Sequence, residues 1–118
     1  MPATLQWAND AGVKAFDQFL SGYYPEGSRG DILAALGYTM AQTLAEVLRR
    51  CGDDLNRENV MAQAAKLQAF APPMLIPGVT INTSATDFSP IKQSRRMRFK
   101  GDTWEMFGDV ISAEPSAR

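Results

Sequence analysis

The segment Ile32–Cys51 constrains the fold most, because its apolar residues recur at helical spacing and no proline interrupts them. Asp31 precedes the segment as an N-cap residue, and Gly52 follows it as a stop in the left-handed region. The principal apolar stripe contains Ile32, Leu33, Leu36, Met40, Leu44, Val47, Leu48 and Cys51. Alanines flank this stripe, so we expect the helix to be packed on more than one side, with another element pressing on Gly37.

Shorter helices are expected on both sides of this segment. Asn9 or Asp10 caps a helix over about residues 10–24, whose single apolar face contains Val13, Phe16, Phe19, Leu20 and Tyr23. Asn56 caps a third helix over about residues 57–69. Prolines and β-branched residues follow Phe70, and they predict a loop and then a short strand over about residues 78–83.

The C-terminal part carries the clearest strand pattern. Basic and apolar residues alternate in the run Arg96, Met97, Arg98, Phe99 and Lys100. Met97 and Phe99 therefore share one face, and the basic side chains share the other. The dipeptide Gly101-Asp102 supplies a tight turn, after which Trp104 and Met106 alternate on the return strand. We predict a hairpin over about residues 94–111, and an α+β chain of three helices, a short strand and this hairpin.

Composition excludes several classes of site. The chain has 118 residues, which suits one domain. Its formal net charge is -1, which does not suit a protein that binds nucleic acid nonspecifically through a positive surface. It has no histidine and one cysteine, Cys51, so it cannot form a tetrahedral Cys/His zinc site, a Ser-His-Asp triad or an internal disulfide. No pair of carboxylates is placed by spacing in an apolar pocket. We therefore expect no catalytic residue, no metal site, no cofactor and no enzymatic activity.

A basic cluster near the C-terminus has two interpretations. It consists of Lys92, Arg95, Arg96, Arg98 and Lys100. These residues could bind phosphate, or they could form a solvated strand face that resists aggregation. We favour the solvated face, because no aromatic residue interleaves on the same face to give a stacking platform.

Three further sets of residues are tested for a function. The acidic group Asp53, Asp54 and Glu58 could hold a hard cation, but turn and helix-dipole roles are preferred because the pattern lacks the glycine and terminal glutamate of a calcium loop. The three tyrosines, Tyr23, Tyr24 and Tyr38, could stack on a ligand but more often belong to a core. Cys51 is expected to be a small buried apolar residue.

The order of short motifs along the chain resembles a known family. The motifs are Trp7–Lys14, Tyr24-Pro25, Gly37-Tyr38, Val47–Leu55, Arg57–Val60, Pro77–Val79, Thr83, Asp87-Phe88, Phe99–Trp104 and Phe107–Val110. Together they resemble the C-terminal part of a type I periplasmic solute-binding protein of the branched-chain amino-acid ABC transporter class. The resemblance covers nearly the whole chain, and it rests on the order and spacing of the motifs because each one alone is weak.

The resemblance implies a receptor for an ABC importer. In that family two α/β lobes close on a small amino-acid-like solute and dock on membrane permease subunits, and the protein is periplasmic. We therefore expect residues 1–118 to be a single partial domain, an α+β fragment of the type I periplasmic-binding fold. The resemblance also leads us to expect that the N-terminal lobe, which holds the amino-acid part of the solute, and the signal peptide are absent from this fragment.

One position of the family's solute site can be carried over. In amino-acid-binding relatives an apolar or aromatic side chain at the start of the Gly-Tyr helix touches the solute, and this turn contains Ile32 and Leu33. Leu33 is the ligand-binding candidate. The alternative is that both residues only pack beneath the cleft, and an aliphatic residue here leaves the identity of the solute open.

The helices of a fragment need cover for their apolar faces. A large aliphatic side chain that stays exposed to water loses about 1.5–3 kcal/mol of the free energy that its burial would contribute. We therefore expect the isolated chain to be a homo-oligomer that buries these faces between copies. Two other functions stay open. One is a ligand-sensing regulatory domain of the same architecture, and the other is a small stand-alone interaction module that uses the basic hairpin.

Overall fold

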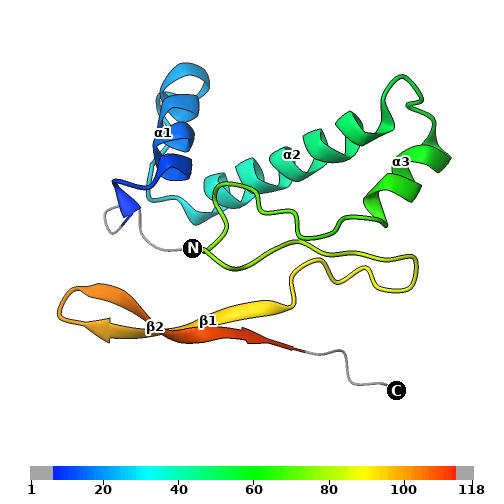
Figure 1. Cartoon of the computed structure of the whole chain (residues 1–118). Helices are drawn as coiled ribbons and strands as arrows, with labels where there is room; N and C mark the ends of the chain where they lie inside the picture. The colour runs from blue at the N-terminus through cyan, green and yellow to red at the C-terminus, as the bar shows by residue number, and fades with distance from the viewer. Residues whose placement is uncertain (1–6, 114–118) are drawn as a thin grey trace.

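Three helices precede one antiparallel hairpin in this α+β chain (Figure 1). The structure, a computed structural model, describes residues 7–113. The elements are α1 (Ala11–Tyr23), α2 (Ile32–Cys51), α3 (Arg57–Ala64), β1 (Gln93–Lys100) and β2 (Thr103–Ser112). An irregular segment, residues 65–92, runs between the helices and the hairpin (Figure 1). Both ends of the predicted domain, residues 1–6 and 114–118, lie outside the described residues.

Side-chain caps start all three helices where the sequence predicts them. The carboxylate of Asp10, and not the amide of Asn9, accepts a hydrogen bond from the N–H of Val13 at 3.0 Å and begins α1. Asp31 caps α2, and Asn56 caps α3. Each cap satisfies one of the free N–H groups at a helix start. Helix α2 then ends at Gly52, which has a φ of 59° and thus a conformation that favours glycine.

Helix α3 is shorter than predicted, since it ends at Ala64 instead of about residue 69. The hydroxyl of Thr83 explains the early end. It donates a hydrogen bond to the carbonyl of Ala64 at 2.6 Å and accepts one from the N–H of Leu67 at 3.0 Å. These bonds replace the helical ones, and they turn the chain so that Leu67 becomes buried with 3% of its surface exposed.

The predicted strand over residues 78–83 is not a strand. Only an isolated bridge forms there, in which Phe70 and Ile81 exchange two backbone hydrogen bonds of 3.2 and 2.7 Å. Prolines explain why no ladder extends from the bridge, because Pro72, Pro73 and Pro77 have no N–H to donate. Ile81 is nevertheless buried, so the segment contributes to the core without joining a sheet.

The conformation of Ala69 gives a first testable prediction. Its φ is 50°, and its N–H donates to the side-chain oxygen of Asn82 at 2.8 Å. A residue with a Cβ pays about 1–2 kcal/mol to adopt the left-handed region, and glycine avoids this cost. Glycine in turn lowers the free energy of unfolding by about 0.5–1 kcal/mol, because it makes the unfolded chain more flexible. We therefore expect Ala69→Gly to raise the free energy of unfolding by about 0.5–1 kcal/mol, measured by urea denaturation.

The matched control for this change is Ala71→Gly. Ala71 is exposed and has no positive φ, so glycine relieves no strain there. The free energy of unfolding of this control should therefore fall by about 0.5–1 kcal/mol. If both variants lose stability to a similar extent, the strain argument is wrong.

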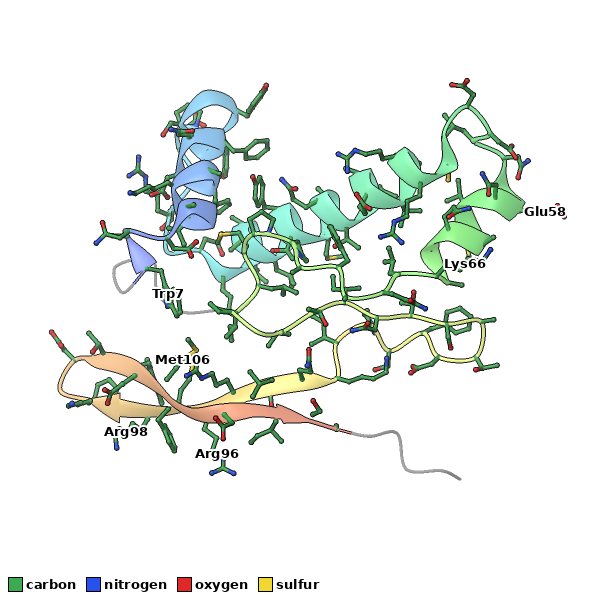
Figure 2. All side chains as sticks on the ribbon, viewed as in Figure 1. Trp7, Glu58, Lys66, Arg96, Arg98 and Met106 are labelled. Carbon is green, nitrogen blue, oxygen red and sulfur yellow. The ribbon has the colours of Figure 1, made fainter. Side chains whose placement is uncertain are left out.

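The hairpin forms over nearly the predicted range, with the predicted faces. Met97 lies opposite Met106, and Phe99 lies opposite Trp104 with ring centroids 5.4 Å apart. Figure 2 shows Met106 on the side of Trp7, while Arg96 and Arg98 point away from the helices. Lys100, Thr103, Glu105 and Phe107 share this outward side, and we call it the outward face of the hairpin.

Two small clusters form the core. One cluster joins α1 to α2 through Phe16, Leu20 and Ala35. The other joins the C-terminal half of α2 to the irregular segment through Val47, Leu67 and Ile81. On the predicted apolar face of α1 the last residues stay outside the core, because Phe19 and Tyr23 are 43% and 81% exposed.

Helix α2 is packed on more than one side, as predicted, but at different ends: α1 packs on Ala35, and Leu67 and Ile81 pack on Val47, which points in another direction. Val47 and Cys51 at the C-terminal end of the predicted stripe are buried, but the other large apolar residues of that stripe are 41–72% exposed. We define the outer face of α2 as Leu33, Leu36, Gly37, Met40, Leu44 and Leu48. Residues 7–113 supply no neighbour at Gly37, because no described atom of another element lies within 4 Å of where a Cβ would be.

The small residues of α2 explain this orientation. Ala35 packs against Phe16 and Leu20, and Tyr38 packs against Phe16 at 5.2 Å between ring centroids. Helix α1 thus covers the alanine side of α2 and leaves the leucines outside. The radius of gyration is 16.2 Å, against about 13–14 Å for a compact domain of this length. The chain is consequently more open than its length requires.

Candidate functional site

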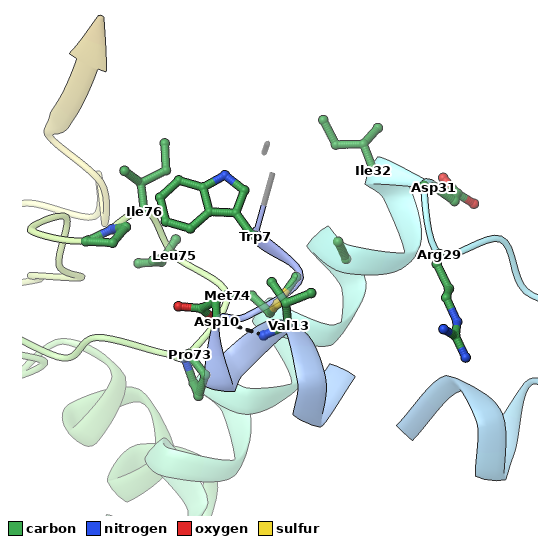
Figure 3. A pocket seen from close by; sticks show the side chains of 13 residues that line it. Trp7, Asp10, Val13, Arg29, Asp31, Ile32, Pro73, Met74, Leu75 and Ile76 are labelled. Atoms are coloured by element: carbon green, nitrogen blue, oxygen red, sulfur yellow. Dashed lines mark hydrogen bonds between the residues drawn. The ribbon is translucent and has the colours of Figure 1, made fainter. Parts of the chain in front are cut away.

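A small cavity lies at the N-terminal end of α2 (Figure 3). Its volume is about 60 Å³. Its walls come from the turn before α1, from the first turns of α1 and α2, and from the loop over residues 73–77. They are mainly apolar, and the chief contributors are Trp7, Val13, Ile32, Ala35, Met74 and Ile76. We call this space the α2 N-terminal cavity.

The close approach of α1 to the loop at residue 73 builds the cavity. Gly12 is buried in the first turn of α1, and a Cβ on it would lie 2.3 Å from the carbonyl oxygen of Pro73. Only glycine allows this distance, so Gly12 fixes how near α1 comes to the loop. Val13 and Ala35 are 8% and 5% exposed, and they form walls that belong to the core as well.

Two carboxylates and one guanidinium stand at the rim. Asp10 and Asp31 each use one oxygen as a helix cap, at 3.0 Å from the N–H of Val13 and 2.9 Å from that of Leu33. The guanidinium of Arg29 lies 3.8 Å from the carboxylate of Asp17 and donates a hydrogen bond to Ser21 at 3.4 Å. Its charge is therefore already engaged by α1, and the rim as a whole is negative.

One polar atom in the wall has no partner. The indole nitrogen of Trp7 is buried, and no hydrogen bond to it is found among residues 7–113. A buried N–H without an acceptor costs about 1–3 kcal/mol. The Trp7 wall is thus the part of the cavity where hydrogen bonding is least satisfied.

Leu33 does not line the cavity. It lies in the first turn of α2 as expected, but its side chain is 72% exposed and belongs to the outer face of that helix. Its neighbour Ile32 lines the cavity instead. Ile32 and Leu33 share the first turn of α2, and the helical spacing places their two side chains on different sides of the helix. The role of Leu33 in solute binding stays a prediction.

The basic cluster is largely paired. Lys92 lies 2.9 Å from the carboxylate of Asp87, and the hydrogen bond from Lys92 holds the pKa of Asp87 below its usual value. Arg98 pairs with Glu105 at 2.9 Å and lowers the pKa of that carboxyl in the same way. Both carboxylates therefore favour the folded state above their usual pKa, and this contribution is lost as the pH falls through the lowered pKa.

One premise about the basic cluster is wrong. Phe107 lies on the outward face of the hairpin, opposite Arg96, and its ring centroid is 5.5 Å from the guanidinium carbon of Arg98. An aromatic ring does interleave with the basic side chains. Its sequence signal was the alternation of Glu105 and Phe107 on the return strand, which becomes informative only once the register is known.

The other candidate residues have structural roles. The segment with Asp53 and Asp54 is a turn, where the carboxylate of Asp54 accepts a hydrogen bond from Asn56 at 2.6 Å. Among residues 7–113 no three carboxylate or thiol groups gather as metal ligands. Tyr38 belongs to the core region as predicted, but Tyr23 and Tyr24 do not, since they are 81% and 54% exposed. Cys51 is buried as expected.

Within the described residues, no helix has the length and apolar character needed to cross a membrane. Comparison of the chain with family models, with curated proteins and with solved structures finds no significant match.

Proposed function

We propose that this chain is the C-terminal portion of the substrate-binding component of an ABC importer for branched-chain amino acids or a related small solute. In this proposal a periplasmic parent protein supplies an N-terminal lobe and a signal peptide, and its partners are the solute and membrane permease subunits. The chain has no catalytic role and needs no cofactor. The proposal rests on the ordered motifs that resemble the type I solute-binding family.

The outer face of α2 is the structural observation that supports this proposal best. In an α/β lobe each helix buries its apolar stripe against a sheet. Here the leucines of α2 face outward, and the two strands of the hairpin lie beyond the irregular segment, where they do not cover that face. In a lobe whose central sheet comes from other parts of the chain, a fragment without that sheet would keep an uncovered apolar helix face. The outer face of α2 fits this description.

Leu33 fits a solute contact in this arrangement. Its side chain is 72% exposed at the start of α2, so a solute bound between two lobes could reach it. The aliphatic character of Leu33 suits an aliphatic or small uncharged part of the solute.

Calorimetry on the longest natural protein that contains this chain tests the proposal. We expect heat and a thermal shift with one member of a panel of leucine, valine, isoleucine, short amides and aromatic acids. Leu33→Ala should weaken that binding about tenfold, which corresponds to about 1.4 kcal/mol. Leu48→Ala, on the same face at the other end of α2, should leave it unchanged. No binding of any solute, or a fused signalling module in the longer protein, would favour a sensory or interaction domain instead.

For the isolated chain we propose that a second copy covers the outer face of α2. An antiparallel pairing that places Leu33 against Leu48 also places Leu44 over Gly37, where space is open. A helix face about 30 Å long and about 10 Å wide buries roughly 600 Å² when two copies pair. Burial of this apolar area contributes about 15 kcal/mol, and association itself costs about 4–15 kcal/mol. The dimer should therefore be weak, with a dissociation constant in the micromolar range.

A charge at the centre of this face should abolish the dimer. Met40 is 64% exposed, so Met40→Glu should leave the monomer folded while raising the dissociation constant at least tenfold, because two carboxylates would meet near the symmetry axis. Sedimentation velocity at 10–100 micromolar, roughly the range of expected affinity, measures the change. Phe88→Glu, at a residue 69% exposed elsewhere, is the control that should not alter association. A wild-type chain that is monomeric throughout this range contradicts the proposed dimer.

A further inference from the structure

We propose that the free edge of β1 docks an extended peptide of another protein in which acidic and apolar residues alternate. We define the free edge as the side of Arg96–Lys100 that faces away from β2. The peptide would add a third strand to the hairpin, antiparallel to β1, which is a recurrent mode of peptide recognition. This surface goes beyond the proposed function, because it involves neither a solute nor a permease.

The backbone of β1 has polar groups that no neighbouring strand uses. Within residues 7–113 the sheet contains β1 and β2 alone. The two-residue turn makes Lys100 and Thr103 a hydrogen-bonded pair, and such pairs alternate along an antiparallel ladder. Met97 and Phe99 consequently direct their N–H and C=O groups toward the free edge, where no described group bonds to them. An added strand would pair with these groups.

The outward face of the hairpin selects acidic residues. Its three cations, Arg96, Arg98 and Lys100, are all on β1, and Figure 2 shows Arg96 and Arg98 pointing away from the helices. One carboxylate, that of Glu105, lies 2.9 Å from Arg98 and 3.6 Å from Lys100, whereas no ion pair to Arg96 is found among residues 7–113. Opposite charges on neighbouring strands stabilise a sheet. Carboxylates on the added strand therefore suit this face.

The opposite face of the same edge selects apolar residues. Phe99 has 62% of its surface exposed, and Trp104, its partner on β2, has 51% exposed. Side chains alternate between the two faces of a strand, so every second residue of an added strand would lie beside Met97 or Phe99. Apolar residues at these positions would cover exposed ring surface and exclude water from it.

A second copy of this chain fits the free edge poorly. Pairing β1 with β1 of another copy would set cations beside cations, which destabilises a sheet. Pairing it with β2 of another copy would offer Glu105 as the acidic residue of the outward face, and Arg98 already holds that carboxylate at 2.9 Å. A strand from a different protein therefore suits the edge better.

A single-stranded nucleic acid also fits poorly. The exposed rings of Phe99 and Trp104 lie on the face opposite to the cations, so bases stacked on them would leave the phosphates away from the basic side chains. Phe107 shares the outward face with the cations, but it is half-buried and has the guanidinium of Arg98 5.5 Å from its ring centroid. A peptide strand, with its alternating side chains, meets both faces at once.

Fluorescence anisotropy on the 118-residue chain tests the proposal with a fluorescein-labelled peptide of about seven residues, in which glutamate alternates with valine. We expect a dissociation constant of about 100 micromolar or tighter. A peptide with lysine in place of glutamate should not bind. A peptide that groups the same glutamates and valines into two blocks should bind at least about fivefold more weakly. Equal binding of the block peptide, or tighter binding of an oligothymidine with the same label, contradicts the proposal.

Methylation of the peptide nitrogens tests whether the peptide binds as a strand. In the antiparallel arrangement the valines lie opposite Met97 and Phe99, so their N–H groups point at the free edge. Methylation of the valine nitrogens should therefore weaken binding at least about tenfold. Methylation of the glutamate nitrogens should leave the bonds to β1 intact. Similar losses from both changes would mean that no strand is added.

Arg96→Gln tests the charge on the chain itself. This side chain is exposed and has no ion pair among residues 7–113, so its replacement should leave the fold intact and weaken binding of the alternating peptide about threefold or more. Arg57→Gln, exposed on α3, is the control that should not alter binding. In the ¹H–¹⁵N spectrum of the wild type, the peptide should shift Met97 and Phe99 and leave α3 unchanged. Unchanged affinity of the Arg96 variant, or no shift at Met97 and Phe99, overturns the proposal.

Discussion

Phe16→Ala is expected to lower the free energy of unfolding by about 3–5 kcal/mol. Phe16 is fully buried, and it packs against Leu20, Ala35 and the ring of Tyr38. Its loss empties the centre of the cluster that holds α1 to α2. Domains are stable by only about 5–15 kcal/mol, so this one change removes a large part of the total.

Urea denaturation followed by circular dichroism measures the effect. Phe88→Ala makes the same chemical change at a side chain that is 69% exposed, and it should cost less than about 1 kcal/mol. A Phe16 variant that unfolds at the same urea concentration as this control would show that the cluster of Phe16, Leu20 and Ala35 is not a core.

Gly12→Ala is expected to destabilise the chain by about 2–4 kcal/mol, although alanine is the better helix former by about 1 kcal/mol. The new Cβ would lie 2.3 Å from the oxygen and 2.8 Å from the carbonyl carbon of Pro73. Both atoms are backbone, so no side-chain rotation relieves the clash. Helix α1 must instead move away from the loop, which opens the α2 N-terminal cavity and disturbs the packing of Val13.

The same helix contains the matched control. A methyl group added at Gly22 would meet no described atom of another element within 4 Å, so Gly22→Ala should raise the free energy of unfolding by about 0.5–1 kcal/mol. Thermal melts of the two variants should therefore shift in opposite directions. Two shifts of the same sign would mean that helix propensity, and not contact with Pro73, decides the outcome at residue 12.

Local signals account for the parts of the fold that the sequence predicts well. Asp10, Asp31 and Asn56 begin their helices through bonds to residues two or three positions away, so the pattern is complete within a short window. The dipeptide Gly101-Asp102 closes the hairpin for the same reason, because Lys100 and Thr103 on its two sides become direct partners.

Contacts between distant residues decide the parts that the sequence does not predict. Helix α3 ends early because Thr83 bonds to Ala64, nineteen positions away. The orientation of α2 depends on whether leucines or alanines meet α1, and helical spacing alone gives both sides apolar character. The cavity is missed for a similar reason, since Gly12 and Pro73 come together only in the folded chain.

The single thiol of the chain can report on the motion of one corner of the fold. Cys51 ends α2 with 6% of its surface exposed, and its carbonyl accepts a hydrogen bond from the side chain of Asn59 in α3 at 3.4 Å. Because the Cys51 side chain is buried, an alkylating reagent can reach the sulfur only when this end of α2 opens locally. The rate of labelling under native conditions therefore gives the free energy of that local opening, without any substitution in the chain.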